Sequence, residues 1–231
     1  MDRINLEKVA IIGRSLSDYI AMFMLKPDEL KGKKIIDFGS GVCSFVKEAN
    51  DLGINVIGID PIYSQTSATI SERSENDIYN IGKQIEFQKD RFEWSDVTYT
   101  GMPQYYSKRL SNLKMFLADF KKNKEHYLNQ SLPKLDFNDK EFELGLVSHL
   151  LFLYDNICDY RFHIASIREM MRICKEVQIH PITDLTGKPS KMIRNLKKDL
   201  PQFDISIELV DYEWHRGSSF TLIIKEQNIK S

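Results

Sequence analysis

Two carboxylates and a glycine-rich turn lie in an order that suits the binding of a nucleoside. Asp37 lies in a short apolar run, and Gly39, Ser40 and Gly41 follow it directly. Glycines permit positive φ angles, and without a Cβ they let backbone amides approach a ligand closely. Asp60 ends the next apolar run, where its carboxylate can accept hydrogen bonds from both hydroxyls of a ribose.

A strand, a turn, a helix and a second strand are predicted to position these residues. The apolar run 35–38 leads into the turn, and a helical pattern extends over 42–52 before Gly53 stops it. The β-branched run 54–59 forms the second strand. This order is typical of one βαβ unit of a parallel sheet. The turn then leads into a helix N-terminus, which carries unpaired N–H groups and partial positive charge.

The turn differs from a dinucleotide-binding turn in two respects. Ser44 stands where the pattern G-x-G-x-x-G requires its third glycine. Asp37 would repel a pyrophosphate but suits a ligand that carries an ammonium or sulfonium charge. The pattern therefore resembles motif I and the ribose-binding acid of the class I S-adenosylmethionine-dependent methyltransferases. The alternative is a purely structural turn in another Rossmann-like protein.

The resemblance implies which residues hold S-adenosylmethionine. The turn from Asp37 through Phe38 to Gly41 would hold the methionine and sulfonium part. Asp60, followed by Pro61 and Ile62, would hold the ribose. Further along, the stretch 126–149 resembles the third and fourth strands of the same family. There Ser131 stands where the family usually has an acid, and Ser131 and the Leu132 amide would border the adenine.

The end of the fourth strand, predicted over 144–147, faces the reacting methyl group in such folds. It carries Ser148 and His149 rather than the Asn/Asp-Pro-Pro-Tyr motif of enzymes that methylate base amino groups or glutamine side chains. Ser148 would border the cofactor. His149 is a candidate general base because its ordinary pKa lies near neutrality. The alternative is a histidine that only orients a neighbour or fills space.

The first segment, 5–25, has apolar residues at helical spacing, with a possible break and a serine N-cap near Ser15. We expect it to form a lid helix beside the cofactor cleft. Arg14 and Tyr19 are then candidates to contact the cofactor or the substrate. The alternative reading is a surface arginine and a core tyrosine.

Residues 83–126 exceed what a short crossover between strands requires. They contain several aromatic residues and an amphipathic helix over 108–122. Additions of this length at a ligand edge are often lids or specificity elements. We expect the insertion to cover the acceptor pocket and to supply Trp94, Tyr105 or Tyr106 to it. The alternative is that these aromatics form a satellite core.

The last third of the sequence predicts a helix over 160–174, strands over 176–180, 204–211 and 220–224, and a terminal β-hairpin. An antiparallel hairpin on a parallel sheet further resembles the class I methyltransferases. The predicted fold is α/β, a Rossmann-like, doubly wound and mostly parallel seven-stranded sheet. The chain, residues 1–231, is expected to form a single domain.

Composition narrows the class of protein. The 231 residues are 42% hydrophobic, and no apolar run is long enough to span a bilayer. The start of the chain has no signal-peptide layout, and the three cysteines have no paired spacing. We therefore predict a cytoplasmic protein with free thiols and no membrane contact. The five histidines form no cluster, so no metal is expected.

The net charge of −1 shows no basic excess, which makes nucleic acid an unexpected partner. The sequence thus predicts an S-adenosylmethionine-dependent methyltransferase that acts on a small molecule, and it resembles a widespread group of bacterial methyltransferase-like proteins. Three alternatives stay open: a nicotinamide-dependent oxidoreductase, a non-catalytic module that binds the cofactor, and a methyltransferase acting on RNA or protein. The sequence leaves the oligomeric state open.

Overall fold

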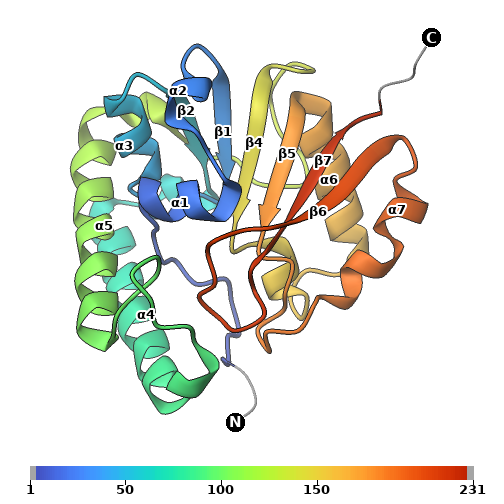
Figure 1. The fold of residues 1–231 in the computed structure, drawn as a ribbon. Helices are drawn as coiled ribbons and strands as arrows, with labels where there is room; N and C mark the ends of the chain where they lie inside the picture. Colours follow the sequence, from blue (N-terminus) through green and yellow to red (C-terminus); the bar gives the residue numbers. More distant parts are fainter. Residues whose placement is uncertain (1–3, 228–231) are drawn as a thin grey trace.

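The computed structural model describes residues 4–227 and contains a seven-stranded sheet in the order β3-β2-β1-β4-β5-β7-β6 (Figure 1). All pairs from β3 to β5 are parallel, and β7 runs antiparallel to both β5 and β6. The predicted mostly parallel sheet with a terminal hairpin is therefore confirmed. The strands are β1 Lys34–Phe38, β2 Asn55–Ile59, β3 Tyr127–Leu128, β4 Phe142–Ser148, β5 Cys174–His180, β6 Phe203–Leu209 and β7 Phe220–Glu226.

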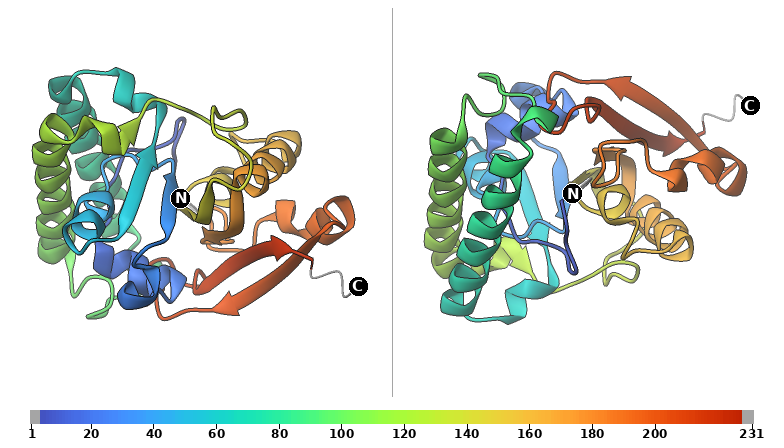
Figure 2. Two further views of the ribbon diagram at one scale, coloured as in Figure 1. Left: turned by 90° about the horizontal axis from the view of Figure 1, so that it is seen from above. Right: turned by 90° about the horizontal axis from the view of Figure 1, so that it is seen from below.

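Helices cover both faces of the sheet (Figure 2). One side carries α1 Leu16–Phe23, α2 Pro27–Leu30, α3 Phe45–Asp51, α4 Ser67–Phe87 and α5 Met102–Lys122, and the other carries α6 Tyr160–Ile173 and α7 Leu196–Asp199. Short 3-10 turns occur at Pro61–Ser64, Lys89–Arg91, Lys124–His126, Leu151–Tyr154 and Lys191–Asn195. No helix lies between β3 and β4; the connecting loop covers the second face with Leu135 and Phe137.

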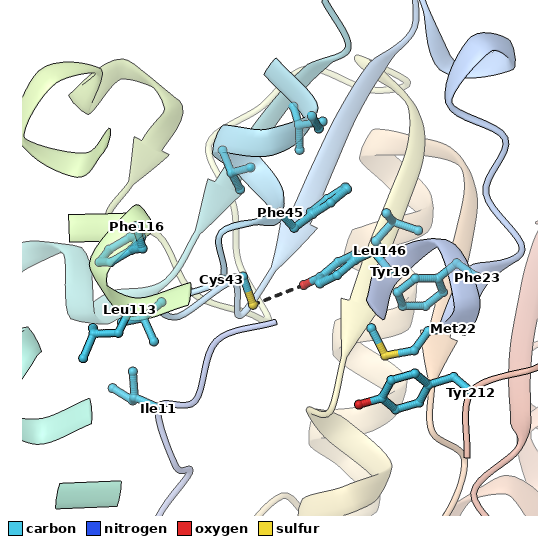
Figure 3. Packing of buried hydrophobic residues seen from close by; sticks show 14 of the residues in the cluster. Ile11, Tyr19, Met22, Phe23, Cys43, Phe45, Leu113, Phe116, Leu146 and Tyr212 are labelled. Atoms are coloured by element: carbon cyan, nitrogen blue, oxygen red, sulfur yellow. Dashed lines mark hydrogen bonds between the residues drawn. The ribbon is translucent and has the colours of Figure 1, made fainter. Parts of the chain in front are cut away.

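Strand alternation divides the core into two clusters. In β1, Ile35 packs toward α1 and α3, whereas Ile36 and Phe38 pack toward α6. Because both faces are covered, the central strands are nearly continuous apolar runs. Figure 3 shows part of the first cluster, in which the ring of Tyr19 stacks on Phe45 with 3.9 Å between ring centroids. The short β-branched runs in the sequence therefore correspond to strands that are buried on both faces of the sheet.

The N-terminal segment differs from the expected lid helix over 5–25. Helix α1 is short, and Ser15 caps it in a capping box with Asp18. Residues 4–13 contain no helix. The N–H of Ala10 donates to the Tyr154 hydroxyl at 3.1 Å, and that of Ile11 donates to the Asp77 carboxylate at 2.9 Å. Because distant side chains satisfy these backbone groups, the helical apolar spacing does not produce a helix.

The insertion is a helical hairpin. Helix α4 continues to Phe87, beyond the predicted start of the insertion at residue 83, and α5 returns beside it (Figures 1 and 2). Gly82 permits close packing, because a Cβ there would lie 2.4 Å from the Tyr106 hydroxyl oxygen. Tyr106 therefore faces α4 rather than a pocket, contrary to one of the expectations for it.

Candidate functional site

A cavity of about 580 Å³ lies where the parallel strands β1, β2, β4 and β5 end. The N-terminal segment, α4 and α5 also contribute to its wall. Ligands in open α/β sheets bind at this edge, outside the carboxyl ends of the strands. The predicted site residues on the wall are Arg14, Gly39, Ser40, Gly41, Asp60, Pro61, Ile62, Tyr105, Ser131, Leu132, Ser148 and His149.

The glycine turn and Asp60 are joined by direct hydrogen bonds. The N–H of Gly41 donates to Asp60 Oδ2 at 3.0 Å, and the N–H of Ile62 donates to Asp60 Oδ1 at 2.9 Å. Gly39 and Gly41 have φ angles of +64° and +53°. Burial raises the pKa of Asp60, while these two N–H groups act in the opposite direction. Each carboxylate oxygen accepts one of these bonds and therefore has capacity for a second.

Asp37 lies behind the turn and not on the wall of the cavity. The Tyr19 hydroxyl contacts both of its carboxylate oxygens, at 2.8 and 2.9 Å. Burial raises the pKa of Asp37 to about 7, although the hydrogen bond from Tyr19 lowers it. Phe38 is fully buried in the second core cluster. Asp37, Phe38 and Tyr19 are all covered by core packing, and none of their side chains lines the cavity.

The adenine side of the predicted site is built by the loop after β3. Ser131 is exposed, and it forms an isolated bridge with Lys134 that tightens the loop. Leu132 is half-buried beside it. Gln130, which the sequence reasoning missed, also lines the cavity, and its side chain accepts a hydrogen bond from the N–H of Asp136.

Ser148 and His149 lie where β4 ends. His149 has a φ angle of +53°, a left-handed conformation that is uncommon for a residue with a side chain. Its N–H donates to the carbonyl of His180, and its Nδ1 lies 3.2 Å from Ser148 Oγ. Burial, and then the charge of Arg14, lower the pKa of His149 well below its ordinary value. The imidazole is therefore neutral at physiological pH and a weaker base than an ordinary histidine.

The aromatic residues of the insertion divide between the cavity and a satellite core. Tyr105 lines the cavity. Trp94 does not: its Nε1 donates to the Lys89 carbonyl, and its ring lies edge-on to Trp214 at 5.1 Å. Contrary to the expectation for it, Trp94 does not line the cavity, because it packs behind Trp214, which does.

Sequence reasoning also missed Arg109, which is buried and lines the cavity. A signal was present in the sequence. Arg109 lies four residues after Tyr105 and four before Leu113, so it falls on the apolar face of an amphipathic helix. A charged residue on such a face is unusual unless it has a specific partner.

Among residues 4–227, no group of histidine, cysteine and acidic side chains is arranged to hold a metal ion. The three cysteines are free thiols, as predicted. None of the helices within this range is long and apolar enough to cross a membrane.

The strand order and the glycine turn beside Asp60 define a Rossmann-like protein with the fold of class I S-adenosylmethionine-dependent methyltransferases. The chain belongs to the same family as the uncharacterized protein MJ0045 of Methanocaldococcus jannaschii, with which it is 36% identical over 226 residues, 97% of this chain and 100% of that protein. No protein-family model matches the sequence.

Two solved methyltransferase structures are similar to the chain. One is the magnesium protoporphyrin IX methyltransferase of Synechocystis PCC 6803 with bound S-adenosylmethionine, at 13% identity, covering 91% of this chain and 78% of that one, with a TM-score of 0.48. The other is a putative S-adenosylmethionine-dependent methyltransferase of Methanococcus maripaludis, at 12% identity, covering 93% and 87%, with a TM-score of 0.44.

Proposed function

We propose that this protein is an S-adenosylmethionine-dependent methyltransferase that acts on a small molecule. The observation that carries the proposal is the joined pair of the glycine turn and Asp60, held by the hydrogen bond from the N–H of Gly41 at 3.0 Å. The pair opens onto a cavity of about 580 Å³, within the range of ligand sites in proteins.

The residues present fit the cofactor. At Gly39 an added Cβ would lie 2.6 Å from Leu150 Cδ2 and would displace that side chain, which also lines the cavity. Asp60 would accept hydrogen bonds from the ribose hydroxyls, and Gln130, Ser131 and Leu132 would border the adenine. When bound, the cofactor supplies a methyl group activated by a sulfonium charge.

Asp37 would act from behind the turn. Its carboxylate is held by Tyr19 and, with a pKa of about 7, is poised between its neutral and charged forms. A positively charged ammonium or sulfonium group bound nearby would favour the charged form. The buried acid thus gives the turn a preference for a cationic ligand.

The chain's other contributions are to enclose the acceptor and to remove a proton from it. The N-terminal segment and the α4–α5 hairpin enclose the cavity, which favours a small acceptor over a macromolecule. We assign His149 as the proton acceptor, because it lines the cavity at the end of β4 and is presented by a left-handed backbone conformation. Free thiols support a reducing compartment, and a cytoplasmic location is part of this proposal.

Calorimetric titration of the purified protein with S-adenosylmethionine, S-adenosylhomocysteine and NAD tests the cofactor. We expect the first two to bind, and Asp60→Ala to weaken their binding by about tenfold or more, because charge-assisted hydrogen bonds to the ribose are lost. Asp96→Ala, at an exposed position, serves as the matched control. Binding of NAD alone would instead support the oxidoreductase, and binding of none of the three would refute the proposal.

A further inference from the structure

Two arginines on the wall of the cavity are buried without an acidic partner. Arg14 is 7% exposed and Arg109 is 1% exposed. Neither takes part in any of the ion pairs found within residues 4–227. Burying an ionised group is costly unless it is paired, so two such groups at one cavity point to an anionic ligand.

Neighbouring groups hold Arg109 in place, and one nitrogen of each guanidinium has no protein partner. Arg109 Nη1 donates to the carbonyl of Gly13 at 2.6 Å, which ties it to the residue preceding Arg14. Its guanidinium lies over the rings of Tyr99 and Tyr105, at 5.1 and 5.5 Å from their centroids. The Nε atoms of both arginines are buried and have no hydrogen-bond partner among the described residues.

Further buried polar atoms without a protein partner gather around the same region. The hydroxyls of Thr183 and Ser218 line the cavity, and neither finds a partner within the described chain. Nε2 of His180, which does not line the cavity but lies one residue before Pro181 on its wall, is likewise unpaired. Buried polar groups are almost always paired, so several orphans at one cavity indicate a polar ligand.

The buried carboxylate nearest in sequence to Arg14 is Asp18, which is already used. Its Oδ2 accepts hydrogen bonds from the N–H and the hydroxyl of Ser15 in the cap of α1. Its charge helps to raise the pKa of Arg109 at longer range. Asp18 therefore moderates the positive potential but forms no ion pair with either arginine within residues 4–227.

We propose that Arg14 and Arg109 form a subsite for an anionic group, a carboxylate or a phosphate, on the methyl acceptor. The remaining wall next to this subsite is apolar and would hold the body of the acceptor; it includes Ile81, Ile85, Phe92, Leu185 and Trp214. This inference rests on the proposed function, because it names the substrate class of the same cavity.

The position of the two arginines favours the acceptor over the carboxylate of the cofactor itself. Arg109 comes from α5, outside the βαβ unit that carries the glycine turn. Both arginines line the same cavity as His149, the proposed proton acceptor at the end of β4. An anion bound to them would lie in the cavity that also holds the group that receives the proton.

Calorimetric titration with benzoate, phenyl phosphate and the neutral benzamide tests the subsite, with S-adenosylhomocysteine present at saturation. The first two probes distinguish a carboxylate from a phosphate. We expect at least one anion to bind, benzamide to bind about tenfold more weakly or not at all, and Arg14→Gln to remove the difference. Arg161→Gln, at an exposed position on α6, should leave binding unchanged.

Circular dichroism checks the fold of each variant. If Arg14→Gln does not fold, Arg14→Lys, which keeps the positive charge, replaces it. It should bind the anion more weakly than the wild type, because it cannot form a bidentate contact.

The outcomes separate this inference from the proposed function. Equal binding of benzamide and the anions, no binding of any probe, or unchanged binding in both Arg14 variants would overturn the anion subsite. Competition between the anions and S-adenosylhomocysteine would assign the arginines to the cofactor's carboxylate and overturn the acceptor assignment. Anion binding by a protein that does not bind S-adenosylhomocysteine would refute methyl transfer, and with it the acceptor role, while leaving an anion site.

Discussion

The hydroxyl of Tyr19 contacts both carboxylate oxygens of Asp37, at 2.8 and 2.9 Å, and the two side chains are fully buried. Helix α1 thereby anchors the acid at the end of β1.

Tyr19→Phe leaves a buried carboxyl without this hydrogen-bond donor, so we expect a loss of about 1–3 kcal/mol in the free energy of unfolding. Urea denaturation measures it. Tyr79→Phe, at an exposed tyrosine of α4, should change stability by no more than about 0.5 kcal/mol; an equal loss in both variants would contradict the prediction.

The raised pKa of Asp37 predicts a pH dependence of stability. Because the folded-state pKa, about 7, lies above the ordinary value of 3.8, the native state binds the proton more tightly than the unfolded chain. The contribution of this group is fully present below pH 3.8 and is lost as the pH rises through about 7. The difference in free energy of unfolding between the wild type and Asp37→Asn should therefore fall as the pH rises through this window, with a slope of up to about 1.4 kcal/mol per pH unit.

Urea denaturation at several pH values measures this difference. Subtracting the variant removes the contribution of His180, whose pKa is lowered to about 3 by burial and by Arg14 and which acts in the opposite direction. A difference that does not change with pH would show that Asp37 titrates near its ordinary value.

Gly39→Ala tests whether the glycine turn serves a ligand as well as the backbone. Gly39 and Gly32 both have positive φ angles, +64° and +78°, but a Cβ at Gly32 would meet nothing within 4 Å. The left-handed backbone should cost each variant about 1–2 kcal/mol of stability, and Gly39→Ala should cost more, because its Cβ would also overlap Leu150 Cδ2. Only Gly39→Ala should also weaken the binding of S-adenosylhomocysteine, measured by calorimetry. Equal affinity in the two variants would exclude a role for the turn in binding.

The contact of Gly82 with Tyr106 predicts a coupling between α4 and α5. Gly82→Ala should destabilise the protein by about 1–3 kcal/mol, because its Cβ would overlap the tyrosine ring. In a Tyr106→Leu background the same change should cost less, since alanine favours a helix over glycine by about 1 kcal/mol once the overlap is relieved. A double-mutant cycle by urea denaturation measures the coupling energy. Additive effects would mean that the two helices do not pack as closely as described.

Local patterns were sufficient for much of the fold. The βαβ unit from Lys34 to Asp60, helix α6 and the terminal hairpin could all be predicted, because each is encoded in residues close together in the sequence. The pairing of the glycine turn with Asp60 follows from the same unit, since two adjacent parallel strands must bring their carboxyl ends together.

Long-range packing decided what local patterns could not. Residues 4–13 have helical apolar spacing, yet Asp77 and Tyr154 bind their backbone N–H groups and hold them in a non-helical path over the cavity. Trp94 and Tyr105 are both aromatic residues of one insertion, yet only Tyr105 reaches the cavity wall.

The sequence by itself determined the class of fold and the pairing of the glycine turn with Asp60, the half of the candidate site for which nucleoside binding is proposed. Only the tertiary structure shows that Arg14 and Arg109, which are far apart in the chain, both line the cavity. It also shows that Arg109 donates a hydrogen bond to the carbonyl of Gly13, the residue before Arg14. The physical reason is that hydrophobic periodicity reports which face of an element is buried. It does not report which distant segment covers that face, or whether a charge on it meets a partner.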